Sequence, residues 1–290
     1  MSHFIPIRAV MAALLASLMF ATMGAAVRYS SAYLPNEMTV FLRNCFGLLF
    51  LLPWIYHQGA SSLATNRLPA HITRSVCGLT AMYCFFYAIA NLHLAEAVLL
   101  NYSSPFFIAI IALVWLREKV SAKIILAITI GFIGICFILK PGAGVFQGAA
   151  WIGLLSAFFA AFAMVTIRNL STTEPTLRIV FYFSLTATLI SSIPLLWTWK
   201  MPELPALLAM ALAGLAASFG QLLLTYSYSN APAALVGPYT YSTVVFAATW
   251  GWLFWSETPD SYTITGAILV IIAGSITLQR KGLPRLTEPD

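Results

Sequence analysis

Long apolar segments fill almost the whole chain, and they constrain its fold more than any single motif does. A helix needs about 20 mostly apolar residues to cross the hydrocarbon layer of a membrane. Only 8% of the residues are charged and 60% are hydrophobic, a composition that no water-soluble domain keeps in solution. The sequence therefore predicts an all-α integral membrane protein with ten transmembrane helices. Their expected spans are 6–27, 37–57, 71–91, 94–116, 122–140, 149–168, 177–199, 205–227, 233–255 and 262–279.

Lysine and arginine are distributed unevenly between the two sets of connecting loops. If both ends of the chain are placed in the cytoplasm, 11 of the 15 basic residues fall on or near the cytoplasmic side. Such an excess is typical of cytoplasmic loops, so the predicted location is the cytoplasmic membrane with both termini inside. The basic residues form no patch of the kind that binds nucleic acid. The expected partners are therefore a small-molecule substrate and membrane lipid.

Two segments in different halves of the chain share one pattern. The first carries the polar cluster 101–105 within an apolar run that ends close to Glu118, and the second carries a Pro/Tyr/Thr cluster before Glu257. Tyr102 lies 139 positions before Tyr241, and Glu118 lies 139 positions before Glu257. Both glutamates are expected to hold the turns that follow their spans, by pairing with basic groups or backbone N–H groups.

Further matches at offsets of 139 to 141 positions run through five successive spans. We predict two repeats of five helices each, residues 1–144 and 145–290, enclosing a central cavity. Because five is an odd number, the second repeat must be inverted in the membrane relative to the first. Inverted repeats are typical of secondary transporters, whose substrate site lies near the membrane midplane between the halves.

The two segments AEAVLLNYSSPFFIAIIALVWLREKVS and APAALVGPYTYSTVVFAATWGWLFWSET, each followed by a Gly-rich span, resemble the EamA type of the drug/metabolite transporter superfamily. The second-span segment FLRNCFGLLFLLP also fits this family. The resemblance implies two helical bundles around a central cavity, with spans five and ten at the periphery. It implies transport of amino acids, S-adenosylmethionine, riboflavin or similar metabolites. The chain departs from the pattern where the second segment ends without the Arg-Glu-Lys of the first, and where the second half has no basic residue matching Arg43.

Polar groups inside the spans are the candidate substrate ligands, because such groups are costly in lipid without a partner. Asn101, Ser104 and Pro105 share one helical stripe, and Pro105 leaves the carbonyl of Asn101 without its helical donor. These groups either line a cavity or only satisfy a kink, and the repetition of the pattern in the second half favours a cavity. The predicted substrate-binding residues are Arg43, Tyr83, Tyr87, Asn101, Tyr102, Ser104, Pro105, Gln221, Tyr239, Tyr241 and Trp250.

Arg43 lies inside the second predicted span, where its side chain either snorkels to the membrane surface or binds a substrate carboxylate. The aromatic residues of the set suit amphipathic, partly planar solutes. The sequence therefore predicts a secondary transporter that moves small amphipathic metabolites, particularly aromatic amino acids, by alternating access. The alternative is an uptake carrier or exchanger for a cofactor-like solute such as S-adenosylmethionine or riboflavin.

An intramembrane enzyme is disfavoured, because no Asp, Glu or His lies at the middle of a predicted span and neither GxSxG nor HExxH occurs. The four cysteines lack the spacing of metal ligands, so no metal and no cofactor is expected. Glycines on spans five and ten, among them Gly134 and Gly266, form close-packing faces. These faces pack within the chain in the predicted monomer; in the alternative they make a dimer contact.

Overall fold

The computed structural model describes residues 7–59, 63–104, 106–108, 111, 122–139, 148–170, 172–230 and 239–278, and the regular structure in these residues is helical. Five of the helices are long and apolar enough to cross a membrane, namely α1, α2, α3, α7 and α10. The helices are α1 (Ile7–Ser30), α2 (Asn36–Gln58), α3 (Leu68–Asn91), α4 (Leu94–Asn101), α6 (Ala122–Leu139), α7 (Gly148–Leu170), α8 (Thr176–Ser192), α9 (Leu195–Thr198), α10 (Leu204–Asn230), α12 (Ser242–Trp255) and α13 (Ser261–Leu278).

Most of these helices begin and end within a few residues of the predicted spans, but the fourth, seventh and ninth spans differ. In the ninth, expected over 233–255, Tyr241 forms a turn and α12 begins at Ser242. The fourth was expected to be continuous, but α4 ends at Asn101, and Tyr102 and Ser103 form a turn. The seventh is divided, because α8 ends before Ile193 and α9 begins after Pro194. Proline lacks the N–H that would continue the helical hydrogen bonding, which accounts for the break between α8 and α9.

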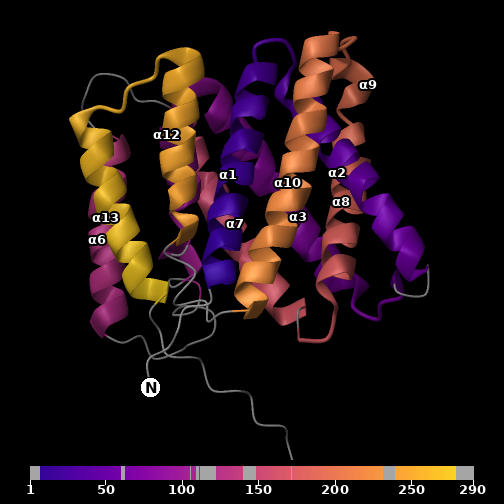
Figure 1. Cartoon of the computed structure of the whole chain (residues 1–290), viewed down its shortest axis with the longest axis horizontal. Coiled ribbons are helices and arrows are strands. Elements are labelled where there is room, and N and C mark those ends of the chain that lie inside the picture. Colours follow the sequence, from indigo (N-terminus) through magenta and orange to yellow (C-terminus); the bar gives the residue numbers. More distant parts are fainter. Residues whose placement is uncertain are drawn as a thin grey trace, which may run out of the picture.

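Helices from the two halves of the sequence pack against each other in pairs. α1 packs along α10, α3 packs along α7, and α6 packs along α13. Figure 1 shows α6 and α13 at one end of the molecule and α2, α8 and α9 at the other, with α1, α10 and α12 between them. The central helices therefore come from both halves of the chain.

Small residues allow α1 and α10 to approach closely. Ala16 of α1 and Ala213 and Ala217 of α10 are buried. A Cβ atom added to Gly220 of α10 would lie 3.2 Å from the Cβ atom of Met19. In lipid, helix association depends on close van der Waals packing rather than on the hydrophobic effect, and small residues supply that packing.

The exterior of the molecule is apolar, whereas its interior contains hydroxyl groups. Large side chains such as Leu196, Trp197 and Phe254 are exposed, while Ser17 and Ser156 are buried. An extensive apolar surface of this kind is a membrane-facing surface. Together with the long apolar helices, it identifies the chain as an integral membrane protein.

The glycine faces of α6 and α13 meet within the chain. A Cβ atom added to Gly134 of α6 would lie 3.0 Å from the carbonyl oxygen of Gly266 and 2.9 Å from the Cβ atom of Leu269. Gly134 and Gly266 are therefore used for an intramolecular contact between the fifth and tenth predicted spans.

Candidate functional site

A polar junction forms where α4 ends and α12 begins. It consists of Ser17, Asn101, Tyr102, Ser156 and residues 239–243. The hydroxyl groups of Tyr102 and Thr243 share a hydrogen bond of 2.7 Å, and the rings of Tyr102 and Tyr241 lie 5.7 Å apart. The junction thus joins two predicted site residues, Tyr102 and Tyr241, that are far apart in the sequence.

Two serines connect the junction to helices α1 and α7. The hydroxyl group of Ser17 lies 3.3 Å from the carbonyl oxygen of Thr240, to which it donates, and the side-chain amide of Asn101 donates to the hydroxyl of Ser156 over 3.0 Å. Ser17 precedes Ser156 by 139 positions, and Asn101 precedes Thr240 by the same 139. The two contacts are therefore equivalent under the offset that relates the two halves.

Other predicted site residues near the junction have different environments. Ser104 is buried next to the turn that ends α4, whereas the side chain of Tyr239 is 37% exposed. The carbonyl oxygen of Tyr239 accepts from Ser17 over 3.4 Å. Pro105 lies outside the described residues.

The remaining predicted residues lie on other helices. Gln221 is half-buried on α10, where its carbonyl accepts from the hydroxyl of Thr225. Trp250 stacks on Phe254 within α12, with ring centroids 5.6 Å apart. Tyr87 on α3 is 40% exposed, on the outer surface of the helix bundle.

Arg43 and Tyr83 lie where α2 meets α3. Arg43 donates from Nη1 to the side-chain oxygen of Asn44 over 2.9 Å, and the buried Asn44 contacts the sulfur atom of Met82. The carbonyl oxygen of Tyr83 accepts from Asn36. The structure therefore gathers part of the predicted set at the polar junction and places Arg43 and Tyr83 between α2 and α3, whereas Tyr87, Gln221 and Trp250 belong to neither group.

Glu257 ties together four segments at one end of the helix bundle. Its carboxylate forms an ion pair of 3.1 Å with Arg28 of α1 and accepts from the backbone N–H of Leu94 over 2.8 Å. Arg28 also donates to the carbonyl oxygen of Ile89. The prediction that Glu257 pairs with a basic group or a backbone N–H is confirmed, and its counterpart Glu118 lies outside the described residues.

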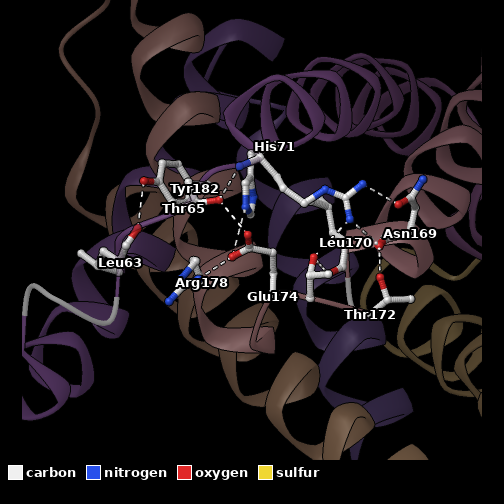
Figure 2. Close-up of polar contacts among 11 residues, drawn as sticks. Leu63, Thr65, His71, Asn169, Leu170, Thr172, Glu174, Arg178 and Tyr182 are labelled. Carbon is white, nitrogen blue, oxygen red and sulfur yellow. Dashed lines mark hydrogen bonds and ion pairs between the residues drawn. The ribbon is translucent and has the colours of Figure 1, made fainter. Parts of the chain in front are cut away.

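A second carboxylate, Glu174, holds the opposite end of the bundle between the α2–α3 and α7–α8 connections. It accepts from Nη1 of Arg178 over 2.6 Å and from the hydroxyl of Thr65 over 2.8 Å, and Nε2 of His71 lies 3.8 Å away. Figure 2 shows the Glu174 carboxylate directed toward His71 and Arg178. None of the residues of this cluster is among the predicted site residues.

Further contacts reinforce this end of the molecule. Arg67 donates to both the carbonyl and the side-chain oxygen of Asn169 and to Thr173. Tyr182 donates to the carbonyl oxygen of Leu63, and both labelled residues are visible at the edge of the cluster in Figure 2. The start of α3 is thereby fastened to the start of α8.

The positions equivalent to the Glu174 cluster in the other half are apolar. Leu34 precedes Glu174 by 140 positions, Met38 precedes Arg178 by 140, and Met210 follows His71 by 139. All three apolar residues are buried in the main hydrophobic core. One end of the molecule is therefore closed by charges where the related region is closed by apolar side chains.

The charge of Glu174 makes stability depend on pH. Burial of the carboxylate opposes its ionisation, but the hydrogen bonds from Arg178 and Thr65 outweigh burial, so the pKa of Glu174 lies below its ordinary value. Because the pKa is lowered in the folded state, the ionised Glu174 carboxylate stabilises the protein fully above about pH 4.5. This stabilisation is lost as the pH falls through the folded-state pKa.

We expect Glu174→Gln to lower the thermal midpoint at pH 7. The difference in thermal midpoint between the variant and wild type should narrow as the pH falls below about 4. Thermal denaturation in detergent between these pH values measures the gap. A gap that stays constant with pH would show that the ionised carboxylate contributes nothing.

Arg74 is not among the predicted site residues, because it is one of the 11 basic residues counted on or near the cytoplasmic side. The structure begins α3 at Leu68, so Arg74 lies about 9 Å inside the helix at 1.5 Å per residue. Its guanidinium carbon lies 3.6 Å from the ring centroid of Phe183 on α8. The spacing Arg74-x3-Gly78, which matches Arg43-x3-Gly47, is the signal that could have found it.

A model of the EamA-like transporter family matches this sequence twice, over residues 7–140 and 147–278. These two matches cover most of the chain. The chain belongs to the EamA-like transporter family. The resemblance noted in the sequence is thereby confirmed, and the chain is a transporter rather than an enzyme, as its family and relatives are.

Several characterised transporters are similar over nearly their whole length. The pseudopaline exporter CntI of Pseudomonas aeruginosa is 39% identical over 91% of this chain and 93% of its own. The S-adenosylmethionine uptake transporter of Rickettsia bellii is 27% identical over 85% and 84%, and the riboflavin transporter of Rhizobium johnstonii is 28% identical over 98% and 96%.

A solved crystal structure shares the fold. It covers 92% of this chain and 95% of its own chain with a TM-score of 0.67, at 16% sequence identity. At that identity the likeness concerns the arrangement of helices alone.

Proposed function

We propose that this EamA-family transporter exports small amphipathic metabolites, amino acids or compounds related to them, from the cytoplasm by alternating access. Two inverted repeats of five helices, residues 1–144 and 145–290, enclose the pathway, and the polar junction forms its substrate site. The observation that carries the proposal is the pair of equivalent contacts, Ser17 with Thr240 and Ser156 with Asn101, on either side of the Tyr102–Tyr241 ring contact.

The equivalence of these contacts supports inversion of the repeats. A twofold axis in the membrane plane exchanges each residue with its partner 139 positions away, so Tyr102 and Tyr241 exchange with each other and lie beside the axis. The same exchange turns the α1–α10 pair into the α7–α3 pair. Substrate sites of inverted-repeat transporters lie beside this axis, at the membrane midplane.

The charges of the loops support an orientation with both ends of the chain in the cytoplasm. In this orientation the Glu174 cluster lies on the cytoplasmic side, and the ion pair of Arg28 with Glu257 lies on the outer side. The protein acts as a monomer, which is supported by the use of Gly134 and Gly266 for a contact within the chain.

Export is supported by the relative with 39% identity, which is a pseudopaline exporter. Pseudopaline is therefore the first candidate solute, followed by amino acids. Uptake of S-adenosylmethionine or riboflavin is the second candidate function, because transporters of these solutes align over most of the chain at lower identity.

Transport by reconstituted protein tests the proposal. Purified protein in liposomes is assayed with radiolabelled phenylalanine, S-adenosylmethionine, riboflavin and pseudopaline, and flux is followed with and without unlabelled solute on the opposite side. We expect saturable flux of at least one solute, accelerated by solute on the opposite side. Flux that never saturates would identify a channel. If none of the four solutes were transported, the proposal would be overturned.

Tyr102→Phe removes the hydroxyl group that bonds to Thr243 while keeping the ring. We expect a loss of about three- to tenfold in transport efficiency, since one hydrogen bond contributes about 0.5–1.5 kcal/mol. Initial rates over a range of solute concentrations measure it. Tyr262→Phe, at an exposed tyrosine of α13, is the matched control and should transport as wild type does. Equal rates for both variants would place the substrate away from the polar junction.

A further inference from the structure

Two arginines from consecutive helices converge inside the helix bundle. Arg43 of α2 reaches one turn along its helix, where its Nη1 lies 3.9 Å from the position of a Cβ atom on Gly47. Arg74 of α3 also reaches one turn along its own helix, where its Nη1 lies 3.1 Å from the position of a Cβ atom on Gly78. The two helices are consecutive and run in opposite directions. Gly47 lies 11 residues before the end of α2 and Gly78 lies 10 residues after the start of α3, so the two guanidinium groups lie at similar depths along adjacent helices. They are close enough for their positive charges to interact.

Neither guanidinium group is neutralised within the described part of the chain. No carboxylate there forms an ion pair with Arg43 or Arg74. The Nε atoms of both arginines and Nη1 of Arg74 are buried without a hydrogen-bond partner there, as is the hydroxyl of Ser75. Two like charges with unused donors at membrane depth are a costly arrangement, and in membrane proteins such groups mark substrate pathways.

An aromatic ring covers one face of the Arg74 guanidinium. Phe183 supplies an aromatic face on which the Arg74 guanidinium lies, which holds that group without consuming its in-plane N–H donors. Phe183 follows Arg43 by 140 positions, so the second half supplies this ring at the place equivalent to Arg43. Helices α2, α3 and α8 contact one another, and Figure 1 shows α2 and α8 together at one end of the molecule. Both halves of the chain therefore contribute to the surroundings of the two arginines.

We propose that Arg43 and Arg74 form a two-cation site for a solute that carries two carboxylate groups, one bound by each guanidinium. A guanidinium binds a carboxylate through two parallel N–H donors, and two guanidiniums from separate helices match two separate carboxylates. This inference rests on the proposed transport function and narrows its substrate class to metabolites with at least two carboxylates. Arg43 alone would select only one carboxylate, and the sequence left that role open beside snorkelling to the membrane surface.

Binding of a matched pair of acids tests the site. Glutarate is a five-carbon chain with two carboxylates, and butyrate is a four-carbon chain with one. Each is added to protein purified in neutral detergent at constant ionic strength, and the shift of the thermal midpoint gives the dissociation constant. We expect glutarate to bind at least tenfold more tightly than butyrate. Equal binding, or no binding of glutarate, would overturn the two-carboxylate site.

Variants separate ligand binding from structural support. Arg43→Gln and Arg74→Gln should each reduce glutarate binding to the level of butyrate, while Arg8→Gln, at an exposed arginine, should leave it unchanged. Without ligand, both inner variants should be as thermally stable as wild type or more stable, because the repulsion between the two charges is removed. A large loss of ligand-free stability in both variants would identify the arginines as structural and overturn the proposal.

Phosphatidylglycerol distinguishes a lipid headgroup from a soluble solute. If this lipid stabilises the protein in a manner that depends on Arg43 and Arg74, and glutarate does not, the site belongs to lipid and the inference fails. Failure of glutarate binding together with saturable flux of another solute would overturn this inference alone. Absence of saturable flux for every solute would overturn the proposed transport function.

Discussion

Glu257→Ala is expected to lower the free energy of unfolding by about 3 kcal/mol, because removing one partner of a buried ion pair leaves the other charge uncompensated. The side chains of Arg28 and Glu257 are only 19% and 9% exposed. The substitution also deprives the backbone N–H of Leu94 of its acceptor. Reversible unfolding with sodium dodecyl sulfate in mixed micelles measures the change. Glu203→Ala, at an exposed glutamate before α10, should have a much smaller effect.

A double-mutant cycle separates the ion pair from the other contacts of Glu257. If the pair contributes, Arg28→Ala in the Glu257→Ala background will cost less than it does in wild type. Strictly additive losses would show that the two charges do not stabilise each other. The prediction also fails if Glu257→Ala unfolds at the same detergent fraction as wild type.

Gly214→Ala is also expected to be strongly destabilising and to lower the free energy of unfolding by about 1–3 kcal/mol. A Cβ atom at Gly214 of α10 would lie 2.6 Å from the Cβ atom of Phe46 and 2.9 Å from the backbone nitrogen of Gly47. A backbone cannot rotate away as a side chain does, so α10 and α2 must separate. The same unfolding measurement reports the loss.

Gly148→Ala is the matched control for this prediction. No atom lies within 4 Å of the position of a Cβ atom on Gly148, at the start of α7. This variant should be as stable as wild type, and a slight gain is expected because alanine favours helix more than glycine does. If Gly214→Ala and Gly148→Ala proved equally stable, close contact between α10 and α2 would be wrong.

Most helices could be located from the sequence because apolar runs of membrane-spanning length mark where a span lies, although they do not mark the residue at which it begins or breaks. The start of α2 after Pro35 and the start of α8 after Pro175 lie within one residue of the expected spans. Pairing between the halves could be anticipated from the constant offset, although the inverted arrangement itself stays a proposal. The break at Tyr102 could not be placed, since a polar cluster is compatible with either a kinked or an ended helix.

The candidate site was predictable only in part. Tyr102 and Tyr241 were identified because they repeat, but Ser17 and Ser156 were not, since a lone serine in an apolar helix has no distinctive pattern. Arg74 was missed for a different reason. A basic residue close to the end of an apolar run is expected in the adjoining loop, and its depth depends on where the helix begins, which composition alone does not define to within one turn.

A mostly buried ion pair holds each end of this helix bundle, and this limits the effect of dissolved salt on the molecule. Mobile ions weaken the attraction between charged groups that water can reach, with a screening length of about 8 Å at physiological ionic strength. The side chains of Glu174 and Glu257 are only 4% and 9% exposed, so both ion pairs are largely shielded from this weakening. The related positions Leu34, Met38 and Met210 carry no charge to screen. Raising the salt concentration should therefore loosen neither end strongly, and the thermal midpoint should change little between low and physiological ionic strength.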